Sequence, residues 1–397
     1  MDGDRQAPAA ASVTEVLGDD DLLREILIRL GFPNYLVRAA LVSKRWLLHA
    51  SDPAFLRRFR DRHPPRLLGF CAGYPSHYRF VPLPQTPELA ALSRRAASSF
   101  DDACSFALND TEIMHCRNGR LITMFWYSGR HSLLSPLLAG EPAAVVPQAP
   151  RPLLEEGTLE RFTEIFLPED GGRDGITWVD LWRIGQKISV DVYVLGPGGW
   201  GVPATTATEL GFPYPTTFFH KMLPPVHGKV FMVTSIGYTL GLDLATATFF
   251  ALELPVGVGN TSYMLSCAED SGIYLVSTDG FQLNVWLHRM TTGHDGGAGG
   301  WLPVDTFCVR EACARLAGHN WVSRDGDYID VAAVGDNAEF VFLDHRASGI
   351  VLYVHLRSRV VEKVFDRQLD SDYIPFSSSQ IIPLMMIWPP IFPALSG

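Results

Sequence analysis

The sequence predicts a multidomain α+β protein, in which a small three-helix module precedes an all-β, six-bladed, propeller-like domain. Apolar side chains recur at helical spacing within residues 15–62. From about residue 70 onward, short β-branched and aromatic runs alternate with Gly, Asp-Gly and Asn-Gly turns. Gly (35) and Pro (28) are abundant, and only 19% of the 397 residues are charged. This composition favours many short elements over long helices.

Three helices are predicted in the first part, two of them with clear start signals. Asp19 to Asp21 provide an N-cap and negative charge where the helix dipole favours it, and Gly31 with Pro33 ends that helix. A second helix is predicted from about Tyr35 to His49. The third begins at Ser51-Asp52-Pro53, which places Asp at the cap and Pro at the first helical position.

The apolar content of this module exceeds what it can bury by itself. Three short helices in about 45 residues have too little interior for so many large apolar side chains. The excess indicates a partner, which is either another protein or another domain of the chain. The alternative is an ordinary helical cap on the larger domain.

Three strings in this region resemble an F-box: LLREILIRL, LVRAALVSKRW and SDPAFLRRF. The resemblance covers roughly residues 15–62, and Val42 to Trp46 is its most specific part. It implies docking onto the Skp-type adaptor of cullin–RING ubiquitin ligases, and through that adaptor onto a cullin. The residues expected to bind the adaptor are Leu22, Leu23, Ile26, Leu27, Leu30, Leu41, Val42, Lys44, Arg45 and Trp46.

The remainder of the chain carries a degenerate repeat. Strand pairs begin near residues 70, 115, 176, 228, 272 and 338, an interval of about 45–65 residues that suits four-stranded propeller blades. A pair of β-sandwiches is the alternative fold, because no WD or double-Gly blade motif is present. An F-box followed by such repeats resembles the plant F-box proteins that carry a kelch-like or F-box-associated propeller.

The expected organisation has five parts. Residues 1–14 form a disordered N-terminus, 15–62 the F-box, 63–70 a linker and 71–380 the β-propeller-like domain for substrate recognition. Residues 381–397 form a Pro-rich apolar segment packed on the β-domain. The apolar run at 381–395 is too short for a spanning helix and contains four prolines, so no membrane association is expected.

Charge and cysteine spacing exclude several classes of protein. The formal charge of −10 argues against nucleic-acid binding, because phosphate neutralisation needs a basic surface. The charge is uneven, with +2 over residues 1–70 and −12 over the rest. Six cysteines without a CxxC pair argue against a zinc site, and no cofactor is expected. The N-terminus lacks the apolar core of a signal peptide, which favours a cytoplasmic or nuclear protein, or one in both places.

Motifs that would indicate catalysis have simpler interpretations. Gly196 to Gly201 matches GxGxxG, but prolines follow where a dinucleotide site needs a helix, so a hairpin turn is predicted. Asp344 and His345 could form half of a catalytic site, but neighbouring side chains on a strand face opposite ways. The pair is therefore interpreted as exposed polar residues at a strand end. The sequence contains no HExxH motif, P-loop or GxSxG elbow. We therefore expect a protein without catalytic activity.

The predicted function is that of the substrate-recognition subunit of an SCF-type (Skp–cullin–F-box) ubiquitin ligase. The target protein is expected to bind the loops of residues 196–227 and 290–301, which combine Gly with aromatic residues. Tryptophans at loop tips are further candidate anchors. A propeller-fold enzyme and a scaffold protein outside the ligase remain alternatives. The candidate target-binding residues are Phe218, Phe219, His220, His294 and Trp301.

Overall fold

The computed structural model divides the chain into two compact units. The helical unit comprises Met1–Leu67 with Met385–Gly397, and the β unit comprises Leu68–Leu384. Each unit is described by itself. The structure describes residues 17–74, 77–104, 111–138, 143–150, 157–169, 175–209, 219–234, 238–258, 263–289, 300–318, 327–367 and 380–392.

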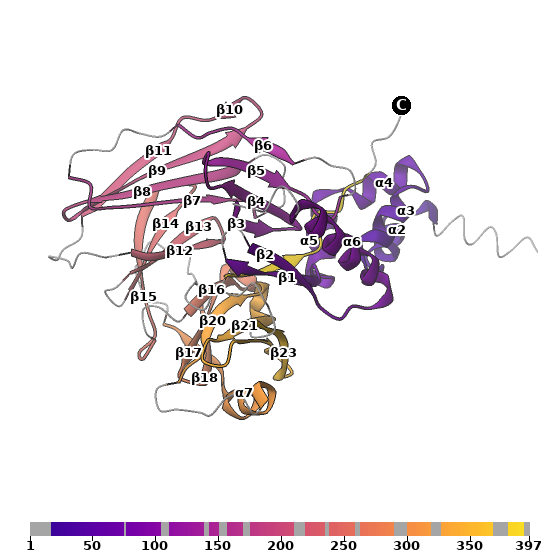
Figure 1. The fold of residues 1–397 in the computed structure, drawn as a ribbon. Coiled ribbons are helices and arrows are strands. Elements are labelled where there is room, and N and C mark those ends of the chain that lie inside the picture. Colours follow the sequence, from indigo (N-terminus) through magenta and orange to yellow (C-terminus); the bar gives the residue numbers. More distant parts are fainter. Residues whose placement is uncertain are drawn as a thin grey trace, which may run out of the picture. The chain divides into compact units, whose positions relative to one another are not determined.

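Short helices make up the described part of the helical unit (Figure 1). Their bounds are α2 (Asp20–Leu27), α3 (Pro33–Ala40), α4 (Lys44–Ala50) and α5 (Pro53–Arg62). The first and last predicted starts are confirmed. Asp19 Oδ1 accepts hydrogen bonds from the amides of Asp21 and Leu22 at 2.9 and 3.0 Å. Asp52 Oδ1 accepts from the Phe55 amide at 2.8 Å, with Pro53 opening α5.

The predicted second helix, Tyr35 to His49, is wrong in one respect, because it consists of α3 and α4. Ser43 lies between them with extended backbone (φ −163°), and its Oγ accepts from the Trp46 amide at 3.3 Å. Serine is a strong N-cap, since its hydroxyl accepts from one of the amides that a helix start leaves without a partner. A new helix therefore begins at Lys44.

The core of the helical unit includes a residue from near the end of the described chain. Leu23, Leu27 and Phe59 are fully buried, and Trp388 joins their cluster. The Trp388 and Phe59 rings are stacked, with centroids 6.1 Å apart and an interplanar angle of 9°. The prediction that residues 381–397 pack on the β-domain is therefore wrong at Trp388, which packs in the helical unit. The short helices leave Phe59 uncovered, and Trp388 covers it.

The β unit is a six-bladed propeller, as predicted from the repeat interval. Each blade is one antiparallel sheet, and the six predicted starting positions fall one in each sheet. The first four-stranded blade consists of β3 (Thr111–Arg117), β4 (Arg120–Phe125), β5 (Arg130–Leu134) and β6 (Ala144–Val146). The next consists of β7 (Glu160–Phe166), β8 (Ile176–Ile184), β9 (Lys187–Gly196), β10 (Gly199–Trp200) and β11 (Ala204–Glu209).

The three blades that follow have four strands each. The third is β12 (Phe219–Val226), β13 (Lys229–Thr234), β14 (Tyr238–Asp243) and β15 (Thr248–Glu253). The fourth is β16 (Tyr263–Cys267), β17 (Ile273–Asp279), β18 (Gln282–His288) and β19 (Leu302–Cys308). The fifth is β20 (Asp330–Val334), β21 (Phe340–His345), β22 (Ile350–His355) and β23 (Val360–Asp366).

The sixth blade joins the two ends of the propeller sequence. It has the order β2-β1-β24 and combines β1 (Leu67–Tyr74), β2 (His77–Pro82) and β24 (Gln380–Met385). Tyr78 Oη donates to Gln380 Oε1 at 2.9 Å, and Gln380 Nε2 donates to Glu112 Oε1 of β3 at 3.5 Å. The strands thus extend into the expected linker 63–70 and past the expected boundary at 380.

Apolar side chains between neighbouring blades form the core of the β unit. Four of the interfaces contain a cluster each, exemplified by the pairs Ile122 and Trp178, Leu181 and Met232, Phe231 and Leu275, and Val285 and Leu343. The fifth and sixth blades meet through Phe342 and Phe70, whose ring centroids lie 4.9 Å apart. The inner strands contact one another in chain order from β7 to β20.

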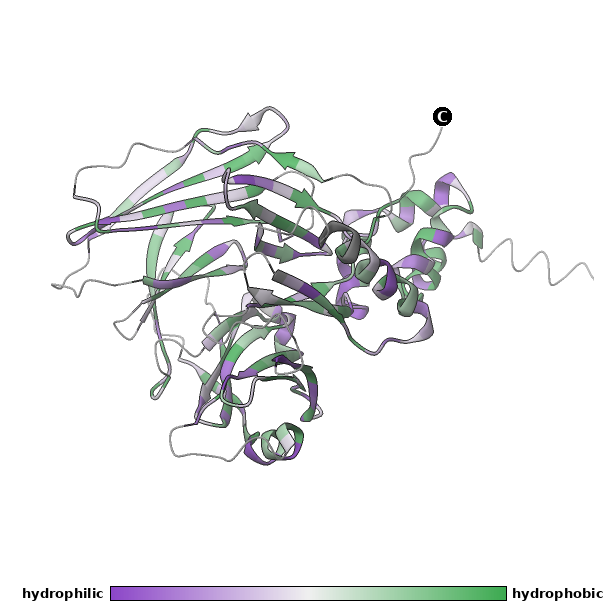
Figure 2. Cartoon of the chain, viewed as in Figure 1, coloured by the Kyte–Doolittle hydropathy of each residue, from purple (hydrophilic) through white to green (hydrophobic). Residues whose placement is uncertain are grey.

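Helical segments and buried charges supplement this core. The helical segments are α6 (Pro87–Cys104), α7 (Arg310–Ala317), η1 (Glu269–Ser271) and η3 (Asp336–Ala338). Figure 2 shows polar and apolar residues interspersed along β8 and β9, where Asp180 and Asp191 are buried. Asp191 Oδ1 accepts from Thr205 Oγ1 at 2.6 Å, so its burial is compensated by a hydrogen bond.

Gly196 to Gly201 forms the predicted hairpin, since Gly199 of β10 pairs with Gly196 of β9. In the described part of the chain, no helix is both long enough and apolar enough to cross a bilayer.

Candidate functional site

A polar network fixes the first helix of the helical unit against the third. Arg45 of α4 donates to Asp20 Oδ1 of α2 through Nε at 2.8 Å and through Nη2 at 2.5 Å. The same guanidinium donates to the carbonyls of Leu17 and Gly18, at 2.5 and 2.7 Å. These bonds provide donors for the two carbonyls that precede α2, and they connect α2 to α4.

His49 completes this network from the same helix as Arg45. Arg24 Nε donates to His49 Nδ1 at 3.2 Å, so the ring proton on Nε2 is directed at Asp20 Oδ1, 3.0 Å away. The Arg45 hydrogen bond, followed by the His49 hydrogen bond, holds the pKa of Asp20 below its ordinary value. Asp20 is thereby kept ionised and able to accept from both partners.

Large apolar side chains remain exposed around this network, although the core beneath it is filled. Leu41, Val42 and Leu48 are exposed by 64%, 65% and 69%, and Leu22 by 46%. Ile26 and Tyr35 are also exposed. We refer to these side chains as the exposed apolar set: Leu22, Ile26, Tyr35, Leu41, Val42 and Leu48. So many exposed large apolar side chains on a small module are typical of a protein-binding region.

The residues predicted to bind the adaptor separate into three groups. Leu22, Ile26, Leu41, Val42 and Lys44 are exposed, and Arg45 is half-buried in the network with Asp20. Leu30 and Trp46 are half-buried against the core cluster. Leu23 and Leu27 are fully buried, so their assignment to the binding surface is wrong. They face inward because the apolar stripe of α2 is wide enough to supply both the core and the surface.

The residues predicted to bind a target are not brought together. Phe219 is buried between the second and third blades, packed edge-on against Phe162 at 5.5 Å, so its assignment to a loop is wrong. It opens β12, where the sheet requires an apolar residue. His220 is exposed on the same strand. The Trp301 Nε1 donates to the Glu253 carbonyl at 2.6 Å, which ties this ring to the neighbouring blade. Phe218 and His294 lie outside the described residues.

Residues 112–392 match the family model described as F-box protein AT5G49610-like, beta-propeller, and residues 19–58 match that of the F-box domain. The chain belongs to this family of F-box proteins. Comparison with curated proteins gives no match.

Solved structures similar to this F-box protein are distant from it in sequence. Luciferin-regenerating enzyme shares 9% identity over 72% of this chain and 93% of its own, with a TM-score of 0.38. A functionally unknown protein from Desulfotomaculum acetoxidans shares 11% identity over 70% and 75% of the two chains, with a TM-score of 0.34. The WD40 domain of SCAP from fission yeast shares 7% identity over 62% and 72%, with a TM-score of 0.30.

Sequence reasoning missed exposed residues in both units of this F-box protein, although Trp126 is one of the tryptophans expected to include anchors at loop tips. Leu48 and Tyr35 belong to the exposed apolar set but were assigned no role. In the β unit, Phe125, Trp126 and Tyr127 lie at the turn between β4 and β5, and Trp126 and Tyr127 are exposed by 53% and 81%. Phe125 and Tyr127 contact each other edge-on, with centroids 6.0 Å apart. The run of three aromatic residues before Ser-Gly is the sequence signal for this tip.

Asp344 and His345 are buried, so their interpretation as exposed turn polarity is wrong. Arg367 donates to both Asp344 oxygens, at 2.6 and 2.8 Å, and His345 Nδ1 lies 2.5 Å from Ser348 Oγ. The bidentate ion pair compensates for the burial of both charges. Among the residues that the structure describes, no group of three or more His, Cys, Asp or Glu side chains could hold a metal ion.

Proposed function

We propose that this F-box protein is the substrate-recognition subunit of an SCF-type ubiquitin ligase. Its F-box docks a Skp-type adaptor and, through it, a cullin, while the propeller binds the target protein. The chain contributes proximity rather than chemistry. A target held near the ubiquitin-charged enzyme reacts in an effectively intramolecular step, because the entropy of encounter has already been lost.

The exposed apolar set is the single observation that carries the proposal. Leu41, Val42 and Leu48 remain in water although the core below them is complete. Burying such side chains against a partner contributes about 25 cal/mol per Å² of apolar area. A partner with a matching apolar groove therefore gains binding free energy without any rearrangement of the helical unit.

The Arg45–Asp20 network favours tight binding by holding this surface in one arrangement before the partner arrives. Both side chains are tied to backbone or to each other by bonds of 2.5–2.8 Å. A surface that is already ordered loses less conformational entropy on association. The network thus acts on affinity through geometry, without direct contact with the adaptor.

The aromatic tip at Phe125–Tyr127 is the part of the β unit best suited to target binding. Trp and Tyr bring a large apolar area with few rotatable bonds, and they are enriched where binding energy concentrates. Residues 71–397 carry a net charge of −12, which favours encounter with a target of basic character. This location replaces Phe219 and Trp301, which serve the packing of the blades.

A matched pair of variants tests the proposal in the full-length chain. Leu41→Asp places a charge in the exposed apolar set, and Val256→Asp places one at an apolar position of the β unit that is more exposed still, since Val256 is 99% exposed. We expect Leu41→Asp to weaken binding to a recombinant Skp-type adaptor by more than about tenfold, with Val256→Asp at wild-type affinity.

Co-purification with a cullin completes this test. Loss of both adaptor and cullin in Leu41→Asp, with both retained in Val256→Asp, supports the ligase role. Wild-type adaptor binding by Leu41→Asp contradicts the assigned surface. Adaptor binding by the wild-type chain without any cullin indicates a scaffold protein outside the ligase.

A further inference from the structure

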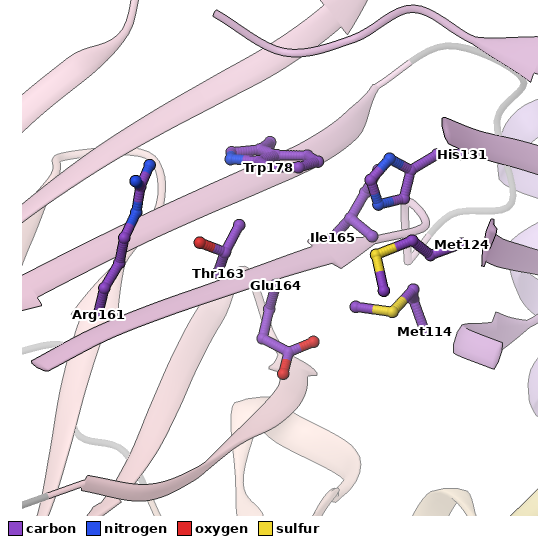
Figure 3. Close-up of a pocket in the computed structure, with 8 residues that line it drawn as sticks. All are labelled: Met114, Met124, His131, Arg161, Thr163, Glu164, Ile165 and Trp178. Atoms are coloured by element: carbon purple, nitrogen blue, oxygen red, sulfur yellow. The ribbon is translucent and has the colours of Figure 1, made fainter. Parts of the chain in front are cut away.

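A cavity of about 280 Å³ lies within the β unit, between the β3–β6 blade and the β7–β11 blade (Figure 3). The β3–β6 blade lines it with Met114, Met124 and His131. The β7–β11 blade lines it from β7, through Arg161 to Ile165, and from β8, through Trp178. Its volume approaches that of small-molecule sites in proteins.

Trp178 provides a buried donor at this cavity. The residue is only 3% exposed, and its Nε1 has no hydrogen-bond partner among the described residues. Trp200 and Trp301 differ, because their indole nitrogens donate to the carbonyls of Pro147 and Glu253 at 2.9 and 2.6 Å. Figure 3 shows the ring nitrogen of Trp178 at the end of the indole that faces Arg161. A buried N–H without an acceptor is unfavourable, so this end of the cavity favours an acceptor from outside the chain.

The charged groups that line the cavity are largely neutralised. Arg161 donates to Asp180 through Nε at 2.8 Å and forms a second bond through Nη2, and Thr163 Oγ1 donates to the same carboxylate at 3.1 Å. Burial, with a smaller contribution from the charge of Glu112, raises the pKa of Glu164 to about 8. Glu164 is therefore mostly uncharged at neutral pH, and the cavity offers no unpaired ionic partner to a charged ligand.

The opposite end of the cavity is lined by apolar side chains and aromatic rings. Met114, Met124 and Ile165 gather there, beside the rings of His131 and Trp178 (Figure 3). Those two rings meet edge to face, with centroids 5.1 Å apart and an interplanar angle of 84°. Thioether sulfurs adapt to aromatic surfaces and contact them favourably. This end suits an aromatic ring.

We propose that the cavity binds an uncharged, planar aromatic molecule whose oxygen accepts a hydrogen bond from Trp178 Nε1. The ring of the ligand lies against Met114 and Met124, and its oxygen lies at the end bordered by Arg161. This site goes beyond adaptor and target binding, and its occupancy is independent of the exposed apolar set.

Three fragment probes on the full-length chain test the site in a ligand-observed NMR titration. Acetophenone has the ring and the acceptor, ethylbenzene has the same shape without the acceptor, and benzoate carries a charge. We expect acetophenone to bind saturably and about 3- to 10-fold more tightly than ethylbenzene, the range that one hydrogen bond provides. Benzoate is expected to bind more weakly than acetophenone, since burying its charge has no compensating partner.

Two variants connect binding to the cavity. Trp178→Phe removes the N–H while keeping an aromatic ring, so acetophenone should fall to the affinity of ethylbenzene, whose own affinity is unchanged. Met124→Trp fills the apolar end and should abolish binding of both fragments. Circular dichroism checks that each variant keeps its β-structure, and the comparison of fragments on the wild-type chain decides the question if a variant does not fold.

Three results would each overturn the proposal. The first is no saturable binding of acetophenone, as expected of a cavity that holds water only. The others are tighter binding of benzoate than of acetophenone, and an unchanged acetophenone affinity in a folded Trp178→Phe chain.

Discussion

The two units depart in opposite directions from the usual distribution of polar and apolar side chains. The helical unit exposes Leu41, Val42 and Leu48 to water, whereas the β unit buries Asp180 and Asp344 in its interior. The first arrangement leaves apolar area available to another protein. The second commits polar groups to partners within the chain.

Buried polar groups of the β unit differ in whether they have a partner within the chain. Asp344 has a bidentate bond to Arg367, and Asp180 has bonds to Arg161 and Thr163, so both carboxylates are compensated. Lys221 donates to the Tyr263 carbonyl at 3.1 Å, and burial lowers its pKa to about 8. Trp178 has no such acceptor among the described residues. Its N–H therefore stays available to a ligand, whereas the carboxylates of Asp344 and Asp180 are committed to partners within the chain.

The largest expected effect tests whether the core of the helical unit depends on the distant Trp388. Trp388→Ala removes the ring stacked on Phe59 and should lower the free energy of unfolding of the helical unit by about 3–5 kcal/mol. Hydrogen exchange of α2 to α5 measures this loss. Ile391→Ala, at an exposed position of the same segment, is the control. Wild-type protection of α5 in Trp388→Ala would show that the ring is dispensable.

The next effect distinguishes core from surface on a single helix. Leu27→Ala empties a fully buried position and should cost about 2–5 kcal/mol of stability. Leu22→Ala, at a half-exposed position of the same helix, should cost less than about 0.5 kcal/mol yet weaken adaptor binding. Thermal denaturation and a binding assay on both variants provide the comparison. Equal stability losses at the two positions would contradict it.

A pH titration tests the buried carboxyl of the β unit. Burial raises the pKa of Glu164 from 4.5 to about 8. The folded chain therefore binds this proton more tightly, and the resulting stabilisation is complete below about pH 4.5 and is lost as the pH rises through about 8. Glu164→Gln should flatten the decline in melting temperature between about pH 5 and pH 9. Parallel pH profiles for variant and wild type would place the titrating group elsewhere.

The smallest effect on stability is expected at the aromatic tip. Changing both Trp126 and Tyr127 to Ala should alter the free energy of unfolding by less than about 0.5 kcal/mol, because both side chains are exposed. Adaptor binding should be unchanged, whereas capture of target proteins should fall. Val145→Ala, at an exposed apolar position of β6 in the same blade, should leave both unchanged. Full target capture by the double variant would remove the tip from the recognition surface.

Local signals predicted much of this fold. Asp19 and Asp52-Pro53 cap the helices where their chemistry indicates, and the repeat interval identified six blades. The break at Ser43 was missed because Leu36, Ala40 and Leu47 continue the helical spacing across it. A cap residue within an unbroken apolar pattern is a weak signal, since propensity alone does not decide between continuation and restart.

Features that depend on distant parts of the chain could not be predicted. β24 pairs with β1 across some three hundred residues, as the Tyr78–Gln380 hydrogen bond illustrates. The division of the α2 stripe into core and surface was also hidden, because Leu22 and Leu23 are equally apolar and only the packing of α3 to α5 separates them. The cavity is assembled from β3, β4, β5, β7 and β8, whose lining residues form no motif in sequence.

The short stretch from Gln380 to Trp388 is synthesised late and contributes to both units. Its strand completes the sixth blade, and its tryptophan covers Phe59 in the helical unit. During translation, α2 to α5 are synthesised more than three hundred residues before this stretch. Trp388 is therefore absent from their core until the end of the chain has been made. A chain truncated before Gln380 lacks the last parts of both units, and Phe59 then has no Trp388 ring to stack on it. The last step in completing the core of the helical unit and the last step in completing the sixth blade therefore depend on the same short stretch of chain.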